Sequence, residues 1–317
     1  MSATITRSHR SGERHSGRNQ LSGQARLERR WGLILALPAV LGFLIFTLGP
    51  MVASFFFSLT DWIIGSSPSF VGLGNYQRMF TEDDLFLKSL GVTTYYTLGA
   101  VPLTMIVGFA IALLLNKQVR ALGVFRTIYY LPTLVPSVAS AVLWIWIFNP
   151  DFGLLNSSLR SVGLPTSNWI YSETAAVPSL VIMSVWGFGN IMVIFLAGLQ
   201  GVPRHLYEAV SIDGGGAWQQ FRHVTLPMMT PIIFYNLVTS VIGTFQVFNQ
   251  AYIMTQGGPN NASLFYIYYL YQTAFTKSEM GYASALAWLL FMIVMVITVL
   301  LFRSARRWVY YEMAGAR

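Results

Sequence analysis

Cysteine is absent from the 317-residue chain, and charged residues make up only 10% of it, against about 25% in soluble domains. The absence of cysteine excludes disulfides, zinc–cysteine sites and thiol catalysis. The shortage of charge is matched by 54% hydrophobic and 15% aromatic residues. Because the apolar residues stand in long uncharged runs without amphipathic periodicity, the composition indicates an integral membrane protein.

The few charges are unevenly distributed along the chain. The formal net charge is +8, and seven of the 20 Lys and Arg residues lie in the first 30 positions. Only hydrocarbon-length segments follow this basic stretch, which argues against a nucleic-acid-binding fold. We therefore predict that residues 1–30, rich in Ser, Gly and Arg, form a disordered tail. The uncharged run 31–60 is longer than the roughly 7–15 residues of a signal-peptide core, and it predicts a retained membrane anchor.

Uncharged windows predict an all-α, polytopic membrane protein with six transmembrane helices, because roughly 20 apolar residues cross a bilayer as a helix. The aromatic segment 264–275 is short for a span, and we expect it at the membrane interface, where tyrosine hydroxyls can stay hydrated. The transmembrane domain should cover residues 31–305. Its expected spans are 31–60, 89–116, 127–150, 174–203, about 228–253 and 280–302.

The loops between these spans differ in their basic residues. Sixteen Lys and Arg lie on the side of the N-terminal tail and four on the other side. Cytoplasmic loops of membrane proteins carry the excess of Lys and Arg. The bias therefore predicts that both termini, including a C-terminal tail at 306–317, are cytoplasmic. The polar stretch between the fourth and fifth spans falls on the same side.

This polar stretch, at about 202–227, has the pattern of a helix pair. Residues 203–212 show apolar side chains at helical spacing. The glycines at 214–216 are expected to end that helix. A second short helix, AWQQFRHV, follows, and we expect Leu226-Pro227 to redirect the chain into the fifth span. Helices this short are stable only when they pack against another surface.

The order of residues in the stretch resembles the EAA motif of binding-protein-dependent ABC importer permeases. That motif reads EAA, three residues, Gly, nine residues, Ile, one residue, Leu-Pro. Here Glu208-Ala209 begin it, Gly214 follows and Leu226-Pro227 close it, while valine replaces the third residue and the isoleucine. The chain is similar to sugar-type permeases, in particular the larger membrane subunit of maltose and glycerol-phosphate importers. Four segments carry this similarity: FVGLGNYQRMF (70–80), VLWIWIFNPDFGLLN (142–156), AGLQGVPRHLYEAVSIDGGGAW (197–218) and TQGGPNNAS (255–263).

The resemblance implies a permease subunit of an ATP-driven importer in a bacterial inner membrane. Its implied partners are a second homologous permease subunit, a dimer of ATP-binding subunits, an extracytoplasmic solute-binding protein and a sugar. The helix pair would dock into a cleft of the ATPase, where Glu208 would pair with a basic residue and Gly214 would permit the tight turn. The implied coupling residues are Glu208, Ala209, Asp213, Gly214, Leu226 and Pro227.

ATP hydrolysis is expected in a partner rather than in this chain, because the sequence has no G-x-x-x-x-G-K-[ST] phosphate loop. We expect neither a cofactor nor a metal site. The four histidines (9, 15, 205 and 223) lie in segments predicted to be cytoplasmic and form no ligand-like cluster. A membrane-embedded enzyme is therefore the least consistent function.

No ionisable residue lies deep in an expected span, which argues against proton or ion coupling. A neutral, hydroxyl-rich solute needs amides, hydroxyls and aromatic faces. Similar positions in the two spans that flank the motif line the solute site of the maltose-type subunit. The candidate pathway residues are Trp186, Gly187, Asn190, Thr244, Gln246, Asn249 and Gln250. Alternatively, such side chains only bond one helix to another.

A stand-alone secondary carrier or channel for a neutral solute is the alternative function. Carriers are typically built from internal repeats and contain charged residues within the membrane. The sequence shows neither feature. The pattern therefore favours the permease subunit over the carrier.

Overall fold

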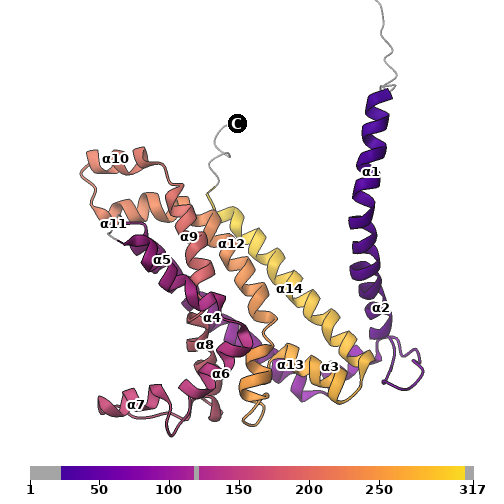
Figure 1. Cartoon of the computed structure of the whole chain (residues 1–317). Helices are drawn as coiled ribbons and strands as arrows, with labels where there is room; N and C mark the ends of the chain where they lie inside the picture. Colours follow the sequence, from indigo (N-terminus) through magenta and orange to yellow (C-terminus); the bar gives the residue numbers. More distant parts are fainter. Residues whose placement is uncertain (1–22, 118–120, 311–317) are drawn as a thin grey trace, which may run out of the picture. The chain divides into compact units, whose positions relative to one another are not determined.

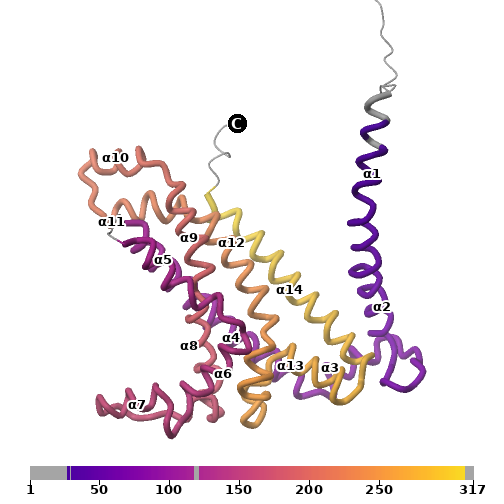
Figure 2. The backbone as a smooth tube through the Cα atoms, viewed as in Figure 1, coloured from indigo at the N-terminus to yellow at the C-terminus, as the bar shows by residue number. Residues whose placement is uncertain are grey.

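The structure is a computed structural model that describes residues 23–117 and 121–310. The chain divides into two compact units, Met1–Ser54 and Phe55–Arg317. In the described residues every regular element is a helix, apart from one antiparallel bridge between Thr60 and Phe70. Figures 1 and 2 trace this all-helical path.

The first unit contains helix α1 (Gly23–Phe43), one π-helical turn (Leu44–Leu48) and the start of helix α2 (Gly49–Ser58). Large apolar side chains are exposed along it, which suits a hydrocarbon environment. Residues 23–30, which we expected in the disordered tail, are helical. They include Gln, Leu, Glu and Arg, which favour helix and extend α1 N-terminally beyond the apolar segment. Residues 1–22 of the expected tail lie outside the described residues.

The second unit is organised around its longest helix, α4, which packs against α8, α9, α12 and α13. The bounds of its helices are α3 (Gly74–Thr81), α4 (Asp84–Leu115), α5 (Leu122–Tyr130), α6 (Ser137–Ile147), α7 (Leu154–Ser161), α8 (Ala176–Val185), α9 (Gly189–Gln200), α10 (Arg204–Ile212), α11 (Ala217–Gln220), α12 (Leu226–Phe245), α13 (Tyr266–Tyr271) and α14 (Met280–Trp308).

Four helical segments of the described chain are long and apolar enough to cross a membrane: Arg30–Ser58, Asp84–Leu115, Ala217–Phe245 and Met280–Trp308. Two further pairs of helices pass the same test together but are bent. Leu122–Leu134 and Ser137–Ile147 meet at 95°, and Ala176–Val185 and Gly189–Gln200 meet at 43°. If each bent pair is one span, the total is the six that the sequence predicts.

The fifth span differs from its predicted course. Helices α11 and α12 are joined without a break through a π-helical turn at Phe221–Thr225, so Leu226-Pro227 does not redirect the chain. In an α-helix a proline ring collides with the carbonyl four residues earlier. The wider π turn directly before Pro227 relieves that collision, with the amide of Leu226 bonded to the carbonyl of Phe221. The helix ends at Phe245 rather than near residue 253.

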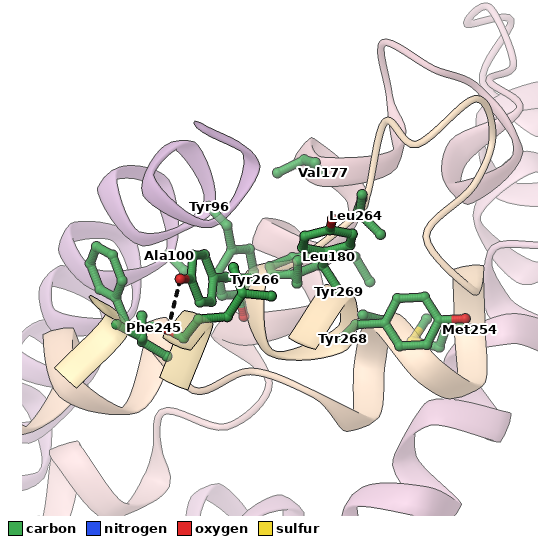
Figure 3. Packing of buried hydrophobic residues seen from close by; sticks show 14 of the residues in the cluster. Tyr96, Ala100, Val177, Leu180, Phe245, Met254, Leu264, Tyr266, Tyr268 and Tyr269 are labelled. Atoms are coloured by element: carbon green, nitrogen blue, oxygen red, sulfur yellow. Dashed lines mark hydrogen bonds between the residues drawn. The ribbon is translucent and has the colours of Figure 1, made fainter. Parts of the chain in front are cut away.

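The aromatic segment around α13 also differs from its prediction. Its tyrosines are not hydrated, because Tyr266, Tyr268 and Tyr269 are buried in the apolar core, as Figure 3 shows. The hydroxyl of Tyr266 donates to the carbonyl of Leu286 at 2.8 Å, and the Tyr266 amide donates to the Thr93 hydroxyl at 2.9 Å. Protein acceptors thus replace the water that the prediction assumed.

Candidate functional site

The loop between the fourth and fifth spans forms one end of the second unit. Helix α10 runs across this end and turns back into α11 (Figure 1). The last described residues lie at the same end, because the amide of Tyr310 donates to the hydroxyl of Thr230 at 2.9 Å. The predicted helix pair therefore consists of α10 and the first turns of the fifth span.

Three consecutive glycines join the two helices, and each has a different environment. Gly214 has a φ of +78°, a left-handed conformation that L side chains rarely adopt. Gly215 has no such strain, but a Cβ there would lie 2.5 Å from Cγ1 of Val210. Gly216 has a φ of −82° and nothing within 4 Å of a Cβ. The turn therefore requires glycine at 214 and 215 but not at 216.

The carboxylates of this loop have no partner in the described chain. Glu208 is exposed and, although Arg204 precedes it by one helical turn, the two form no ion pair. Asp213, at the C-terminal end of α10, and Ala209 are also exposed. Three of the predicted coupling residues thus face outward together with Gly214.

Leu226 and Pro227, the last two predicted coupling residues, are placed differently. They begin α12, with Leu226 exposed and Pro227 half-buried. Their neighbours Val224 and Thr225 are buried. This closing part of the motif therefore lies near the N-terminal end of the fifth span rather than on the outer face of the loop.

Two large apolar side chains of the loop were not singled out from the sequence. Ile212 is 86% exposed, and Trp218 is 70% exposed while its ring stacks on Phe221 with centroids 5.5 Å apart. Both stand in a hydrophilic stretch at the end of the unit that carries Glu208. The signal available in the sequence was a large apolar residue at each of these two positions of a hydrophilic loop.

A pocket of about 240 Å³ lies where the two bent spans approach each other. It brings together four of the seven predicted pathway residues, namely Trp186, Gly187, Asn190 and Gln250. No charged residue is among those that line it in the described chain. Its other lining residues are Tyr96, Pro132, Thr133, Val135, Ser137, Ser140, Leu180, Met183 and Ser184.

The breaks in the helices shape this pocket. In the third span the chain leaves the helix at Val135, before Pro136, and bends by 95°. In the fourth span it bends at 186–188, and Gly189 follows. A Cβ at Gly189 would lie 2.6 Å from Cγ2 of Thr133, so glycine permits the close approach of the two spans.

The remaining three predicted pathway residues are more scattered. Asn249 donates from Nδ2 to the hydroxyl of Ser137 at 2.8 Å, and Ser137 lines the pocket. Thr244 lines a second cavity of about 240 Å³, which shares Ser184 with the first. Gln246 is exposed and lines neither cavity.

The hydroxyl groups of the pocket were missed from the sequence. Ser184 donates to the carbonyl of Val181 at 2.6 Å and lies 3.3 Å from the Thr104 hydroxyl. Thr133 donates to the carbonyl of Tyr130 at 2.7 Å. Serine and threonine bond to their own helix in this way throughout membrane spans, so the sequence holds no signal that distinguishes those at a pocket.

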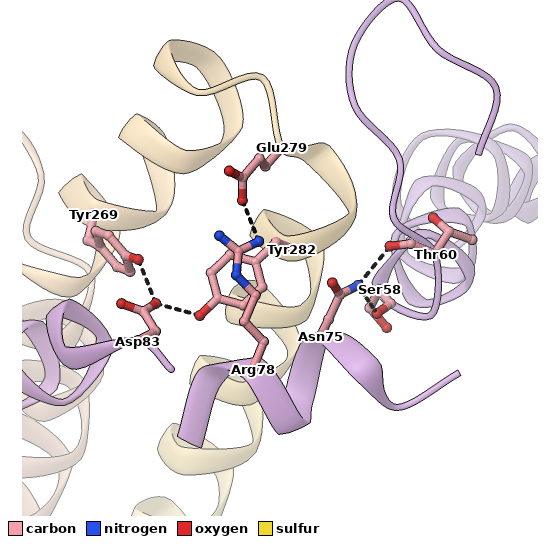
Figure 4. Close-up of polar contacts among 8 residues, drawn as sticks. All are labelled: Ser58, Thr60, Asn75, Arg78, Asp83, Tyr269, Glu279 and Tyr282. Atoms are coloured by element: carbon pink, nitrogen blue, oxygen red, sulfur yellow. Dashed lines mark hydrogen bonds and ion pairs between the residues drawn. The ribbon is translucent and has the colours of Figure 1, made fainter. Parts of the chain in front are cut away.

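A polar cluster closes the opposite end of the unit (Figure 4). Asp83 caps α4 by accepting hydrogen bonds from the amides of Leu85 and Phe86. It also accepts from the hydroxyl of Tyr269 at 2.6 Å and from the hydroxyl of Tyr282. Burial, followed by the bond to Asp83, raises the pKa of Tyr269, so this phenol stays a neutral donor.

The same cluster joins helix α3 to the start of α14. Arg78 forms an ion pair with Glu279 at 2.7 Å, and its guanidinium lies 4.3 Å from the ring centre of Tyr282. The hydrogen bond that Arg78 donates to Glu279 is the main reason why the pKa of Arg78 is raised. Asn75 donates from Nδ2 to the carbonyls of Ser58 and Thr60 at 2.9 and 2.7 Å. Arg78, Asn75 and Asp83 thus find their hydrogen-bond partners within the same chain.

Residues 101–309 match the family model of the binding-protein-dependent transport system inner membrane component. The chain belongs to this family. It is 43% identical to the probable ABC transporter permease protein YesP of Bacillus subtilis, over 89% of this chain and 92% of the relative. Two further relatives are 33% identical. The arabinooligosaccharides transport system permease protein AraP of B. subtilis matches over 84% of this chain and 86% of its own length. The trehalose/maltose transport system permease protein MalF of Thermococcus litoralis matches over 88% and 95%.

Solved structures agree with the fold. A chain of a bacterial alginate ABC transporter, in complex with an alginate pentasaccharide-bound periplasmic protein, superposes with a TM-score of 0.79 at 21% identity. The match covers 89% of this chain and 96% of that chain. Our chain is therefore a multi-pass permease subunit of an ABC importer, and the carrier alternative is not supported.

Proposed function

We propose that this permease carries a neutral sugar or oligosaccharide and forms half of its translocation path. The uncharged pocket between the two bent spans is the observation that carries the proposal. It offers the amides of Asn190 and Gln250, several hydroxyls and the ring of Trp186. Such groups recognise sugar hydroxyls and the apolar faces of sugar rings. The names of the relatives AraP and MalF, which specify oligosaccharide and disaccharide transport, agree with this assignment.

The proposed path includes Trp186, Gly187, Asn190, Asn249 and Gln250, with Thr244 in the adjoining cavity. The second homologous permease subunit would complete it, and an extracytoplasmic solute-binding protein would deliver the sugar. Gly187 contributes space, because a Cβ there would meet only the carbonyl of Ser184 at 3.5 Å. A larger side chain at 187 would therefore fill the pocket without a clash in the backbone.

The proposed coupling element is the outward face of the loop at 202–227. Exposed Glu208, Ala209 and Asp213, around the turn at Gly214, would dock into a dimer of ATP-binding subunits. Leu226 and Pro227 would transmit the movement, because they begin the helix that continues as the fifth span. Rigid-body rocking of the spans would then alternate access to the pocket.

Uptake by the assembled importer in proteoliposomes tests the sugar path. We expect Asn190→Leu to lower sugar uptake roughly tenfold, because one hydrogen-bonding amide is replaced by an apolar group. Complex assembly should not change. Gln246→Leu is the matched comparison, since its amide lies outside both cavities. Full uptake by Asn190→Leu would leave helix packing as the role of this residue.

Thiol labelling tests the proposed orientation in a bacterial inner membrane, with both termini in the cytoplasm. The cysteine-free chain makes single replacements unambiguous. Arg160→Cys should react with an impermeant reagent added outside, and Trp218→Cys should not. The reverse pattern would place the loop outside and refute its contact with the ATPase.

A further inference from the structure

A cavity of about 430 Å³ lies at the loop end of the unit, away from the solute pocket. It is formed where α4 and α9 end and where α5 and α10 begin. Its polar lining residues in the described chain are Asn116, Lys117, Arg126, Gln200, Arg204 and Tyr207. Three of these six side chains are cationic and none is acidic.

The three cations have no counter-charge within the described residues. The ion pair found there, Arg78–Glu279, lies at the opposite end, so Lys117, Arg126 and Arg204 form no ion pair with another described residue. The Nε atom of Arg126 is buried and has no hydrogen-bond partner in the described chain. A buried donor without an acceptor is costly, and cations that face one cavity repel each other. An anion in the cavity would relieve both penalties.

The donor set fits phosphate oxygens in particular. Two guanidinium groups and one ammonium group can surround a tetrahedral anion, because each guanidinium presents several N–H groups in a planar fork. The amides of Asn116 and Gln200 add neutral donors. The hydroxyl of Tyr207 already contacts the hydroxyl of Thr225 at 3.1 Å and steadies α10 against the spans.

The position of the cavity indicates the source of the phosphate. The apolar spans α4 and α9 end at Leu115 and Gln200, so the cavity lies at the boundary of the hydrocarbon layer. Helix α5, which supplies Arg126, exposes Val124, Phe125 and Ile128. Acyl chains can lie along this apolar surface while the headgroup reaches the cations. We propose that the cavity binds the phosphate of an anionic phospholipid such as phosphatidylglycerol.

Lipid binding to the purified full-length chain in its complex tests this proposal. Native mass spectrometry would compare phosphatidylglycerol with phosphatidylcholine, with and without inorganic phosphate. We expect wild type to retain phosphatidylglycerol preferentially, and Arg126→Gln and Arg204→Gln each to weaken its binding roughly tenfold. Arg222→Gln is the matched control, because Arg222 is exposed on the same loop but does not line the cavity. It should bind phosphatidylglycerol as wild type does.

The arms of the experiment distinguish the outcomes. Equal retention of both lipids by wild type, together with no phosphate binding, would overturn the proposal. So would equal losses in Arg126→Gln and Arg222→Gln. Inorganic phosphate that binds at the cavity while phosphatidylglycerol does not would retain the phosphate site and replace its lipid source. If Arg126→Gln does not assemble, phosphatidylglycerol binding by Arg204→Gln, on a largely exposed helix, is compared with that of Arg222→Gln instead. The test uses no transport, so its outcome is separate from that of the proposed sugar path.

Discussion

At one end of the unit Phe55–Arg317, Asp83 accepts four hydrogen bonds, two from amides and two from the hydroxyls of Tyr269 and Tyr282. At the other end, Glu208 is exposed and has no ion-pair partner among the described residues. Both are carboxylates, Asp83 at the start of the long helix α4 and Glu208 within the short helix α10. The first is satisfied by its own chain, whereas the second is available to another chain. The contrast distinguishes Asp83, which stabilises the fold of this chain, from Glu208, which is available for contact with another subunit.

The apolar side chains of the two ends repeat this contrast. Around α13, tyrosine rings are buried and pack against α4 and α14. On the loop, Ile212 and Trp218 are among the exposed large apolar residues of the chain. Substitutions at the first end should therefore change the stability of the folded protein, and substitutions of the exposed side chains of the loop should change mainly its coupling to partners.

The largest expected effect concerns Asp83. Asp83→Ala should lower the free energy of unfolding by roughly 3 kcal/mol, because a helix cap is lost and two phenolic hydroxyls lose their acceptor. Denaturant unfolding of the purified complex would measure it. Asp84→Ala is the matched control, since the neighbouring carboxylate is exposed in the first turn and should contribute less than about 1 kcal/mol. Equal losses would remove the distinction between the cap and its neighbour.

The next effect concerns the loop turn. Gly214→Leu should cost about 1–2 kcal/mol at the left-handed position and place a side chain at the proposed contact. We expect solute-stimulated ATP hydrolysis of the reconstituted complex to fall at least roughly tenfold. Gly216→Leu, two residues later, has an ordinary φ and free space. If both variants lose coupling equally, backbone strain at 214 is not the cause.

Removal of the loop carboxylate should have a smaller effect. Glu208→Ala should reduce stimulated hydrolysis about fivefold, as expected for the loss of an ion pair worth about 1 kcal/mol. The melting temperature of the chain should not change, because Glu208 forms no ion pair with another described residue. Glu208→Gln, which keeps the shape, should lose nearly as much coupling. A fall in melting temperature instead would assign Glu208 to the fold.

The smallest effect is expected at the exposed edge of the polar cluster. Glu279→Gln should lower the free energy of unfolding by less than about 1 kcal/mol, because the side chains of Arg78 and Glu279 are 44% and 26% exposed. The same denaturant experiment detects it, and added salt should shrink the difference. A loss as large as that of Asp83→Ala would show that the ion pair, and not the tyrosine–aspartate bonds, holds this end together.

The sequence predicted six spans, the number that the structure contains if each bent helix pair is one span, because hydrophobicity over long windows determines the count. It did not predict the continuity through Leu226-Pro227, because a π turn accommodates the proline and leaves no signature in composition. Burial of α13 was also missed. The acceptor of the Tyr266 hydroxyl, the carbonyl of Leu286, is 20 residues away and becomes a neighbour only in the folded chain.

The candidate site was predictable to a similar extent. The amides Asn190 and Gln250 stood out because amides are costly inside spans, and both line the pocket. Gln246 had the same signal but lies outside it, since α12 ends at Phe245 and the next residue is exposed. Whether such an amide faces the pocket depends on where the helix ends or bends, which hydrophobicity does not specify.

Protection of the loop by the ATPase tests the central claim most directly. Ile212→Cys, in the cysteine-free chain, places a thiol at a position that is 86% exposed. In inside-out vesicles stripped of the ATP-binding subunits, this thiol should react rapidly with a maleimide, and restored subunits should protect it at least roughly tenfold if the contact buries it. Arg160→Cys, on the segment predicted to be external, should be unaffected by the subunits. Equal labelling of Ile212→Cys with and without the ATPase would contradict docking at this loop.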